Sequence, residues 1–324
     1  MKKIIGYISV LLIILMLLPT VFLVSCDNGS RDGKIGIVCT AFAQYDFTMN
    51  IIGENVDKFE VTYLLESGTD MHSYSNSISV SDKVKILSSS LFICIGGSSE
   101  KWIDELTGAD DANNTKVVKL IESVGELVCL SDHAHKEHSD HDHSHAHECD
   151  EHIWLSPKRA LMMCDAICEE ICALDGENAD KYRENNEKYK EKLEALDKEY
   201  ENTFSSEKAH LVFADRFPFV YLTNDYSVGY SAAFDGCSTE TNATYETVVS
   251  LVNDIKAKDI KVLIKLEKSK TDIADTLIAE SGRENMSVMS VISMQNVSKK
   301  EINDGMTYIS AMYENLEVFG KAIN

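Results

Sequence analysis

The sequence predicts an α/β protein of two lobes, each built on a mostly parallel sheet, joined by one long helix. Two series of short β-branched runs predict the two sheets, because helix-like segments separate the runs within each series. Between the two series lies a highly charged segment whose apolar residues recur at helical spacing, which predicts the joining helix. A chain of about 300 residues also exceeds one ordinary domain and fits two lobes of about 140 residues each.

The beginning of the chain has the pattern of an exported protein. Two lysines precede a long apolar run, which ends in LVSC at positions 23–26. LVSC resembles a bacterial lipobox, which implies cleavage before Cys26 and acylation of that cysteine. We therefore expect a signal peptide at residues 1–25, a tether at 26–33 and a lipid anchor at Cys26. The alternative is an uncleaved anchor, because the apolar run is about long enough to span a membrane.

We expect the first lobe at residues 34–176. Its predicted strands are, in order, KIGIVCTA, KFEVTYLL, SLFICIGG and TKVVKL. Helix-like segments separate these runs, as in a parallel sheet that is covered by helices. The segment 131–149 lacks any apolar periodicity, so it is predicted to be a solvated loop within this lobe.

The predicted joining helix covers residues 177–205. Its apolar residues recur mostly at steps of three, four and seven: Ala179, Tyr182, Tyr189, Leu193, Leu196, Tyr200 and Phe204. Two favourably oriented i,i+4 ion pairs are also expected, Glu184 with Lys188 and Glu194 with Lys198. A helix of about 28 residues is roughly 40 Å long, enough to join the lobes and to limit their hinging. The alternative is a long surface helix within one domain.

The second lobe is expected at residues 206–324. Its predicted strands are AHLVFAD, VGYSAAF, KVLIKLE and MSVMSVI, and helical segments such as TDIADTLIAESG lie between them. The two lobes thus have the same alternation of strands and helices.

Charge and cysteine usage narrow the possible functions. The whole chain has a formal net charge of −22, and removal of residues 1–25 leaves 29 basic against 53 acidic side chains, a charge of −24. Such a surface repels phosphate backbones and attracts cations, which argues against nucleic-acid binding. Apart from Cys26, the eight remaining cysteines form no C-x-x-C pair.

Three of these cysteines stand four residues apart on one predicted helical stripe. They are Cys164, Cys168 and Cys172, and they alternate with Ile167 and Ile171. We interpret the stripe as a core face in which cysteine acts as a small hydrophobic residue. The alternative is a thiolate ladder that binds a soft metal.

Eight of the ten histidines lie within residues 133–154. Seven of them form a dense tract with alternating polar residues: His133, His135, His138, His141, His143, His145 and His147. Imidazoles at this spacing offer many overlapping ligand sets, and imidazole suits zinc, copper and nickel. Because flexible ligands must be ordered on binding, the tract is predicted to be an auxiliary metal collector or sensor. A solvated charged loop without a metal role is the alternative.

Enzyme motifs are missing from the sequence. HECDEH resembles the zinc-protease pattern H-E-x-x-H, but His147 and His152 are five residues apart rather than four. The inverted pattern fails because Glu148 stands where histidine is needed. There is also no G-x-S-x-G elbow and no phosphate-binding loop. We therefore expect a protein that is not an enzyme and has no catalytic residues.

Four segments, in order, resemble the zinc and manganese branch of ABC-transporter solute-binding proteins. They are G-x-D-x-H-x-Y at 68–74, G-x-x-x-E-x-W from Gly96 or Gly97, D-E-H-I-W-L-S-P at 150–157, and LVFADRFPFVYL at 211–222. The resemblance covers nearly all of the mature chain, including a closing helix at GMTYISAMYENLEVF. It implies two lobes joined by a rigid helix, with a metal ion bound in the cleft between them and delivered to a membrane permease.

The resemblance also implies a set of metal ligands. His72 and His152 fall on the first two ligand positions, both in the first lobe. The third position is Ala214, so Asp215 is the candidate there, although alternation along a strand turns it to the other face and Arg216 could pair with it.

No strong zinc ligand stands near Met294, where the resemblance implies a fourth ligand. Glu240 and Glu267 are therefore weaker candidates, and His147 or another histidine of the tract is a further possibility.

The sequence as a whole predicts a lipid-anchored, monomeric, extracytoplasmic receptor that captures Zn²⁺ and delivers it to an ABC permease. Zinc is favoured over Mn²⁺, because manganese prefers more oxygen ligands. A surface metallohydrolase and an adhesin-like lipoprotein with a structural metal are the alternatives. The identity of the metal, its affinity, the permease, the extent of lobe movement and the ligands of the second lobe remain open.

Overall fold

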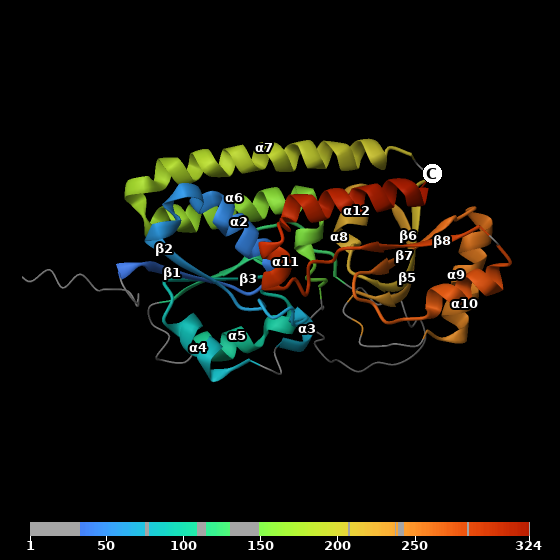
Figure 1. Cartoon of the computed structure of the whole chain (residues 1–324), viewed down its shortest axis with the longest axis horizontal. Helices are drawn as coiled ribbons and strands as arrows, with labels where there is room; N and C mark the ends of the chain where they lie inside the picture. The colour runs from blue at the N-terminus through green and yellow to red at the C-terminus, as the bar shows by residue number, and fades with distance from the viewer. Residues whose placement is uncertain are drawn as a thin grey trace, which may run out of the picture.

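The computed structural model describes residues 33–74, 78–108, 115–129, 149–206, 208–236, 238, 243–283 and 285–323. The chain forms two α/β lobes side by side, and a long helix runs along one side of both (Figure 1). This arrangement confirms the predicted fold class.

Each lobe contains a four-stranded parallel sheet. In the first lobe the strands are β1 (Ile35–Cys39), β2 (Phe59–Tyr63), β3 (Leu91–Cys94) and β4 (Lys116–Lys119), in the order β2-β1-β3-β4. In the second they are β5 (His210–Phe217), β6 (Gly229–Asp235), β7 (Val262–Leu266) and β8 (Ser287–Val291), in the order β6-β5-β7-β8. The structure confirms all eight predicted strands. In such open sheets, ligands bind outside the carboxyl ends of the strands, where the strand order reverses.

Helices cover both sheets. Those of the first lobe are α2 (Phe42–Ile52), α3 (Met71–Tyr74), α4 (Val80–Leu87), α5 (Trp102–Thr107) and α6 (Pro157–Leu174). Those that follow the joining helix are α8 (Val220–Asp225), α9 (Tyr245–Ala257), α10 (Ile273–Ser281), α11 (Lys299–Asn303) and α12 (Tyr308–Ile323). Pro157 is the first residue of α6, a position that proline tolerates because its missing N–H would be unpaired there anyway. Among the described residues, no helix is long and apolar enough to cross a membrane.

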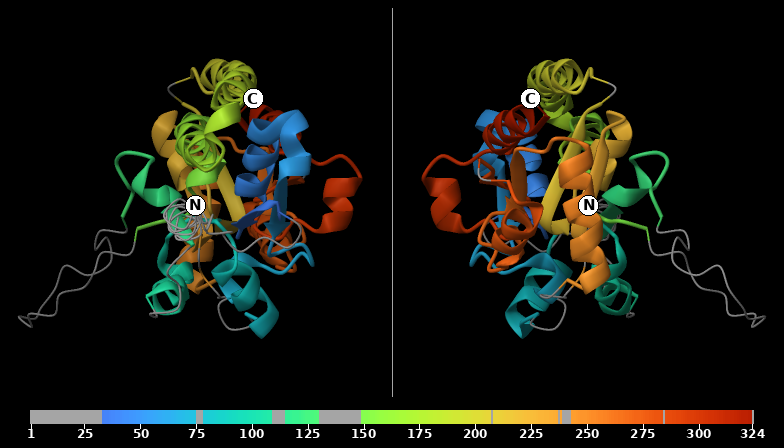
Figure 2. Two further views of the ribbon diagram at one scale, coloured as in Figure 1. Left: turned by 90° about the vertical axis from the view of Figure 1, so that its left-hand side faces the viewer. Right: turned by 90° about the vertical axis from the view of Figure 1, so that its right-hand side faces the viewer.

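The joining helix is α7 (Ala179–Thr203), which lies at the edge of the molecule in both end-on views (Figure 2). Its predicted stripe is buried at Tyr182, Tyr189, Leu193, Leu196 and Tyr200. The hydroxyl of Tyr189 donates to Asp46 of α2 at 2.8 Å, and that of Tyr200 donates to the Met312 carbonyl of α12 at 2.7 Å. One helix is therefore bonded to elements that precede and follow it along the chain.

The three cysteines of α6 are buried, as predicted for a core face. Burial raises the pKa of the Cys168 thiol to about 12, and burial also raises that of Cys164. Neutral thiols of this kind are poor metal ligands, so the packing interpretation holds.

The structure contains a disulfide that the cysteine spacing did not predict. Cys129 and Cys149, 20 residues apart, are bonded and form an isolated antiparallel bridge. The search for C-x-x-C pairs missed it because a disulfide depends on the distance between two residues in the fold, not on their separation in sequence.

A second connection between the lobes is the segment 293–299, which follows β8 and contacts the first lobe at several points. Trp154 donates its indole N–H to the Ser293 carbonyl at 2.9 Å, and the Tyr63 hydroxyl donates to the Val297 carbonyl at 2.8 Å. The backbone N–H of Met71 donates to the Gln295 carbonyl at 3.3 Å. These bonds hold the second lobe against the segments of the first lobe that carry His72 and His152.

The buried carboxyl of Asp46, beneath α7, makes the stability of the protein depend on pH. Burial raises its pKa to about 6 despite the hydrogen bond from Tyr189. The folded state therefore binds this proton more tightly than the unfolded state, and the stabilisation is lost as pH rises through the folded pKa.

We predict that the free energy of unfolding of Asp46→Asn, relative to that of the natural protein, rises by roughly 2–3 kcal/mol as the pH is raised from 4 to 6.5. Urea denaturation at several pH values measures this difference, and Asp180→Asn, on the exposed surface of α7, controls for the loss of one charge. A difference for Asp46→Asn that stays constant with pH would contradict the prediction.

Candidate metal centre

The two predicted histidine ligands lie in direct contact. The Nε2 atoms of His72 and His152 are 3.0 Å apart, and their rings meet edge to face with centroids at 5.1 Å. The His152 ring is fully buried and the His72 side chain is 14% exposed. Two residues that are 80 positions apart in the sequence thus direct their Nε2 atoms toward each other.

His72 lies in α3, shortly after the carboxyl end of β2. This helix is a single turn. Asp70 begins this turn, because its carboxylate accepts the His72 backbone N–H at 3.0 Å and its carbonyl accepts the Ser73 N–H at 3.1 Å. These bonds satisfy N–H groups at the start of the turn, as a helix cap does.

Glu151 orients the ring of His72. Its carboxylate lies 2.9 Å from Nδ1 of His72 and also accepts the Ser99 backbone N–H at 3.1 Å. Burial opposes ionisation of Glu151, but the hydrogen bond from His72 and the other polar contacts outweigh it, so the pKa is lowered. The neighbour of His152 in sequence is therefore the partner of His72 in space.

Asp150 orients the ring of His152. One carboxylate oxygen lies 2.8 Å from the backbone nitrogen of His152 and 2.9 Å from its Nδ1. The ring also packs on Trp154, with centroids 5.3 Å apart. On the side of the second lobe, the backbone at Gly236 is so close that an added Cβ would lie 3.2 Å from Cε1 of His152.

The two carboxylates determine which nitrogen of each ring is free. A carboxylate accepts a hydrogen bond, so Nδ1 of each ring is assigned as the N–H donor and Nε2 as the atom with the lone pair. Two lone pairs that face each other at 3.0 Å repel each other unless a proton or a metal ion lies between them. Two imidazoles beside two buried carboxylates complement the charge of a divalent cation, and imidazole nitrogen suits zinc-type metals.

Glycine residues after β3 allow Glu151 to reach His72. An added Cβ at Gly97 would lie 2.0 Å from the Glu151 carboxylate, so only glycine fits there. Next to it, the Gly96 N–H donates to Glu100 at 2.7 Å, and burial raises the pKa of Glu100 to about 7. In the G-x-x-x-E-x-W motif, Gly97 thus leaves room for the Glu151 side chain, and Glu100 binds the backbone of the neighbouring Gly96.

Sequence reasoning did not assign roles to Glu151, Asp150 or Gly97. The available signal was the acidic pair directly before His152, because metal-binding histidines commonly donate their second N–H to a carboxylate. The sequence does not reveal that Glu151, directly before His152, contacts His72 instead, since only the fold brings His72 to this loop.

In the second lobe, Asp215 is 2% exposed and both of its carboxylate oxygens accept backbone N–H groups. Oδ1 accepts from Arg216 at 2.8 Å, and Oδ2 accepts from Leu266 at 3.1 Å. The guanidinium of Arg216 lies 4.0 Å from Asp70 of the first lobe. Ala214 is buried in the hydrophobic core of the second lobe, and the pairing of β5 with β6 is irregular between positions 213 and 216.

Glu267, after β7, accepts hydrogen bonds from the backbone N–H and the hydroxyl of Ser293, both at 2.8 Å. Burial raises its pKa. Glu267 therefore supports the segment whose carbonyl at Ser293 binds Trp154, two residues after His152.

Other predicted positions fall outside the part of the chain that the structure describes. They are Cys26, Glu240 and the seven histidines of the tract: His133, His135, His138, His141, His143, His145 and His147. Within the described ranges, no group of three or more His, Cys, Asp or Glu side chains is arranged to hold a metal ion. His72 and His152 thus form a pair without a described third ligand.

Comparison with known proteins agrees with this arrangement. The family model described as zinc-uptake complex component A, periplasmic, matches residues 37–322. The zinc-binding lipoprotein AdcA of Streptococcus pneumoniae is 29% identical over 309 residues, which cover 94% of this chain and 59% of that protein. The high-affinity zinc uptake system protein ZnuA of Bacillus subtilis is 27% identical over 300 residues, with 90% and 91% covered. The chain thus spans about three fifths of the length of AdcA.

Solved structures have the same fold. Zn(II)-bound AdcA from Streptococcus pneumoniae superposes with a TM-score of 0.70 at 26% identity, covering 90% of this chain and 58% of that one. The metal-dependent lipoprotein YcdH from Bacillus subtilis gives a TM-score of 0.73 at 24% identity, with 90% and 99% covered. The second likeness supports the fold alone.

We predict that Gly97→Ala weakens Zn²⁺ binding by about tenfold or more, because its new methyl group displaces Glu151 from His72. Competition with a chromophoric chelator measures the affinity. Gly176→Ala is the matched control, since an added Cβ there meets no atom within 4 Å. Equal affinities of the two variants would show that the contact between Glu151 and His72 does not matter for metal binding.

Proposed function

Because the chain belongs to the zinc-uptake complex component A family, we propose that it is an extracytoplasmic receptor that captures Zn²⁺ and delivers it to an ABC permease. The observation that carries the proposal is the convergence of the Nε2 atoms of His72 and His152 at 3.0 Å. A tetrahedral zinc ion with nitrogens at 2.0–2.1 Å would hold them about 3.3 Å apart, so binding needs only a small opening. The family consists of solute-binding receptors, and we propose no catalytic step for this chain.

His72 and His152 are the proposed first two ligands. Zinc takes four ligands, so the second lobe or water supplies the others. Asp215 lies near the carboxyl end of β5 and Glu267 directly follows β7, and these are the two middle strands of the second sheet. Parallel sheets place ligand-binding groups at this end of their strands. Glu240 lies outside the described residues and is four positions after Gly236 in the sequence. All three remain candidates. Nitrogen donors favour zinc over Mn²⁺, which stays the alternative cargo.

The proposed setting of this receptor is the outer face of a bacterial cell membrane. The LVSC sequence supports acylation of Cys26 as the anchor, and a monomer that meets its permease at the membrane is the proposed working form. The histidine tract between positions 133 and 147, which lies outside the described residues, is the proposed auxiliary collector.

We predict that His72 and His152 dominate tight zinc binding. Their joint replacement by alanine, in the mature chain with the seven tract histidines changed to asparagine, weakens Zn²⁺ binding at least about 100-fold, or about 2.7 kcal/mol. Chelator competition measures the affinity.

The matched control is His210→Ala in the same background. His210 lies at the opposite end of β5 and hydrogen-bonds to Ser231 at 2.9 Å, so its loss leaves zinc affinity unchanged. Undiminished tight binding by the chain that lacks His72 and His152 would overturn the assignment.

A further inference from the structure

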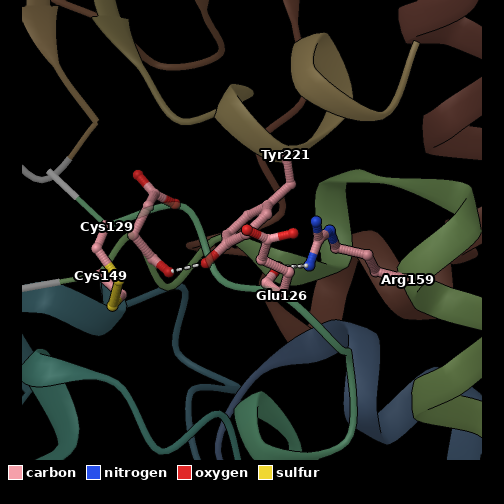
Figure 3. The surroundings of a disulfide bond; sticks show 6 residues. Glu126, Cys129, Cys149, Arg159 and Tyr221 are labelled. Atoms are coloured by element: carbon pink, nitrogen blue, oxygen red, sulfur yellow. Dashed lines mark hydrogen bonds between the residues drawn. A yellow bond between two sulfur atoms is a disulfide. The ribbon is translucent and has the colours of Figure 1, made fainter. Parts of the chain in front are cut away.

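The disulfide between Cys129 and Cys149 (Figure 3) is one residue in sequence from Asp150, whose carboxylate orients His152. Asp150 follows Cys149, and its backbone N–H donates to the Val128 carbonyl at 2.9 Å, beside Cys129. The disulfide and this hydrogen bond join the same two short backbone segments. The position of Asp150 is therefore set by the segment that ends at Cys129.

That segment is itself held by a buried arginine. Arg159, 6% exposed, donates from Nη1 to the carbonyls of Val124 and Glu126 at 3.1 and 2.8 Å. Its other nitrogens make two hydrogen bonds, both of 3.0 Å, to the carboxylate of Asp225 in α8. Two parallel charge-assisted bonds fix the guanidinium geometrically, so the 124–129 segment is well anchored.

A second contact reaches Asp150 from the second lobe. The hydroxyl of Tyr221 donates to the Asp150 carbonyl, and the guanidinium of Arg159 lies over the Tyr221 ring at 4.2 Å (Figure 3). Asp150 is thus held through its N–H by the first lobe and through its carbonyl by α8. Because these two bonds use only its backbone, the Asp150 carboxylate can contact the backbone nitrogen and Nδ1 of His152.

We propose that the Cys129–Cys149 disulfide is a positioning element of the metal site, which acts on His152 through Asp150. The proposal rests on the proposed function, because it takes His152 as a metal ligand. The disulfide fixes the backbone of Cys149 to the anchored 124–129 segment, and this fixes the carboxylate that sets the orientation and tautomer of His152. In sequence, residues 130–148 contain the histidine tract. Because the covalent link joins Cys129 to Cys149, the position of Asp150 does not depend on the conformation of the residues between them.

A double-mutant cycle with Zn²⁺ as the probe tests this role, in the mature chain with the tract histidines changed to asparagine. Cys129→Ser with Cys149→Ser is expected to weaken binding about tenfold, and Asp150→Ala about 10- to 100-fold. If the disulfide acts through Asp150, its removal adds little to the loss already caused by Asp150→Ala. If the disulfide contributes only to overall stability, its removal either leaves zinc affinity unchanged or weakens it by the same factor with and without Asp150→Ala. Either result would contradict the proposal.

The ligand-field spectrum of bound Co²⁺ provides a readout that global stability does not move. We expect the same change of spectrum in the disulfide-free variant and in Asp150→Ala. The matched control is Cys168→Ala with Cys172→Ala, which removes two buried thiols of α6 and is expected to leave both affinity and spectrum unchanged. An unchanged spectrum in the disulfide-free variant would overturn the proposal.

If the serine variant does not fold, the natural disulfide can be reduced in the folded protein and its two thiols alkylated, with mass spectrometry confirming which cysteines reacted. Zinc affinity within twofold of the oxidised protein would then overturn the proposal. If Asp150→Ala and His152→Ala both leave affinity unchanged, the metal-site assignment itself fails. If these two variants bind Zn²⁺ more weakly but loss of the disulfide does not weaken binding, the proposed role of the disulfide is wrong and the metal-site assignment stands.

Discussion

Two imidazole lone pairs face each other across 3.0 Å, and the arrangement around them depends on that one contact. It exists because each ring is held through its other nitrogen by a buried carboxylate, Glu151 for His72 and Asp150 for His152. Two facing lone pairs repel each other unless a proton or a metal ion lies between them, and hydrogen bonds from the surrounding structure hold the two rings in place. Glycine at position 97, the short helix begun by Asp70 and the disulfide beside Asp150 each contribute to this.

The fold provides the frame for this contact. Two parallel sheets of the same strand order direct the carboxyl ends of their strands to the region where ligands bind in such proteins. The α7 helix and the segment 293–299 connect the lobes at two places, and the second of these contacts the segments around both histidines. The second lobe reaches His152 by backbone at Gly236 and reaches α3 by the Gln295 carbonyl.

Most of the fold could be predicted from the sequence because its signals are local. Eight β-branched runs became eight strands, and the spaced aromatic and leucine residues of α7 became its buried face. Resemblance to a family, rather than a local pattern, singled out His72 and His152, which the structure brings together. Their role as metal ligands stays a prediction. The contact between Glu151 and His72 and the disulfide depend on residues far apart in sequence. Asp150 and Asp70 are close to the two histidines in sequence, but no sequence pattern assigned a role to them. No ligand of the second lobe could be singled out, because Ala214 is part of the core and both oxygens of Asp215 accept backbone N–H groups.

The central claim is that one zinc ion sits between Nε2 of His72 and Nε2 of His152. Anomalous diffraction at the zinc absorption edge, from crystals of the chain loaded with one equivalent of Zn²⁺, tests it most directly. The account predicts one dominant anomalous peak within about 2.0–2.1 Å of both nitrogens. A dominant peak elsewhere, with none between these two rings, would contradict the account.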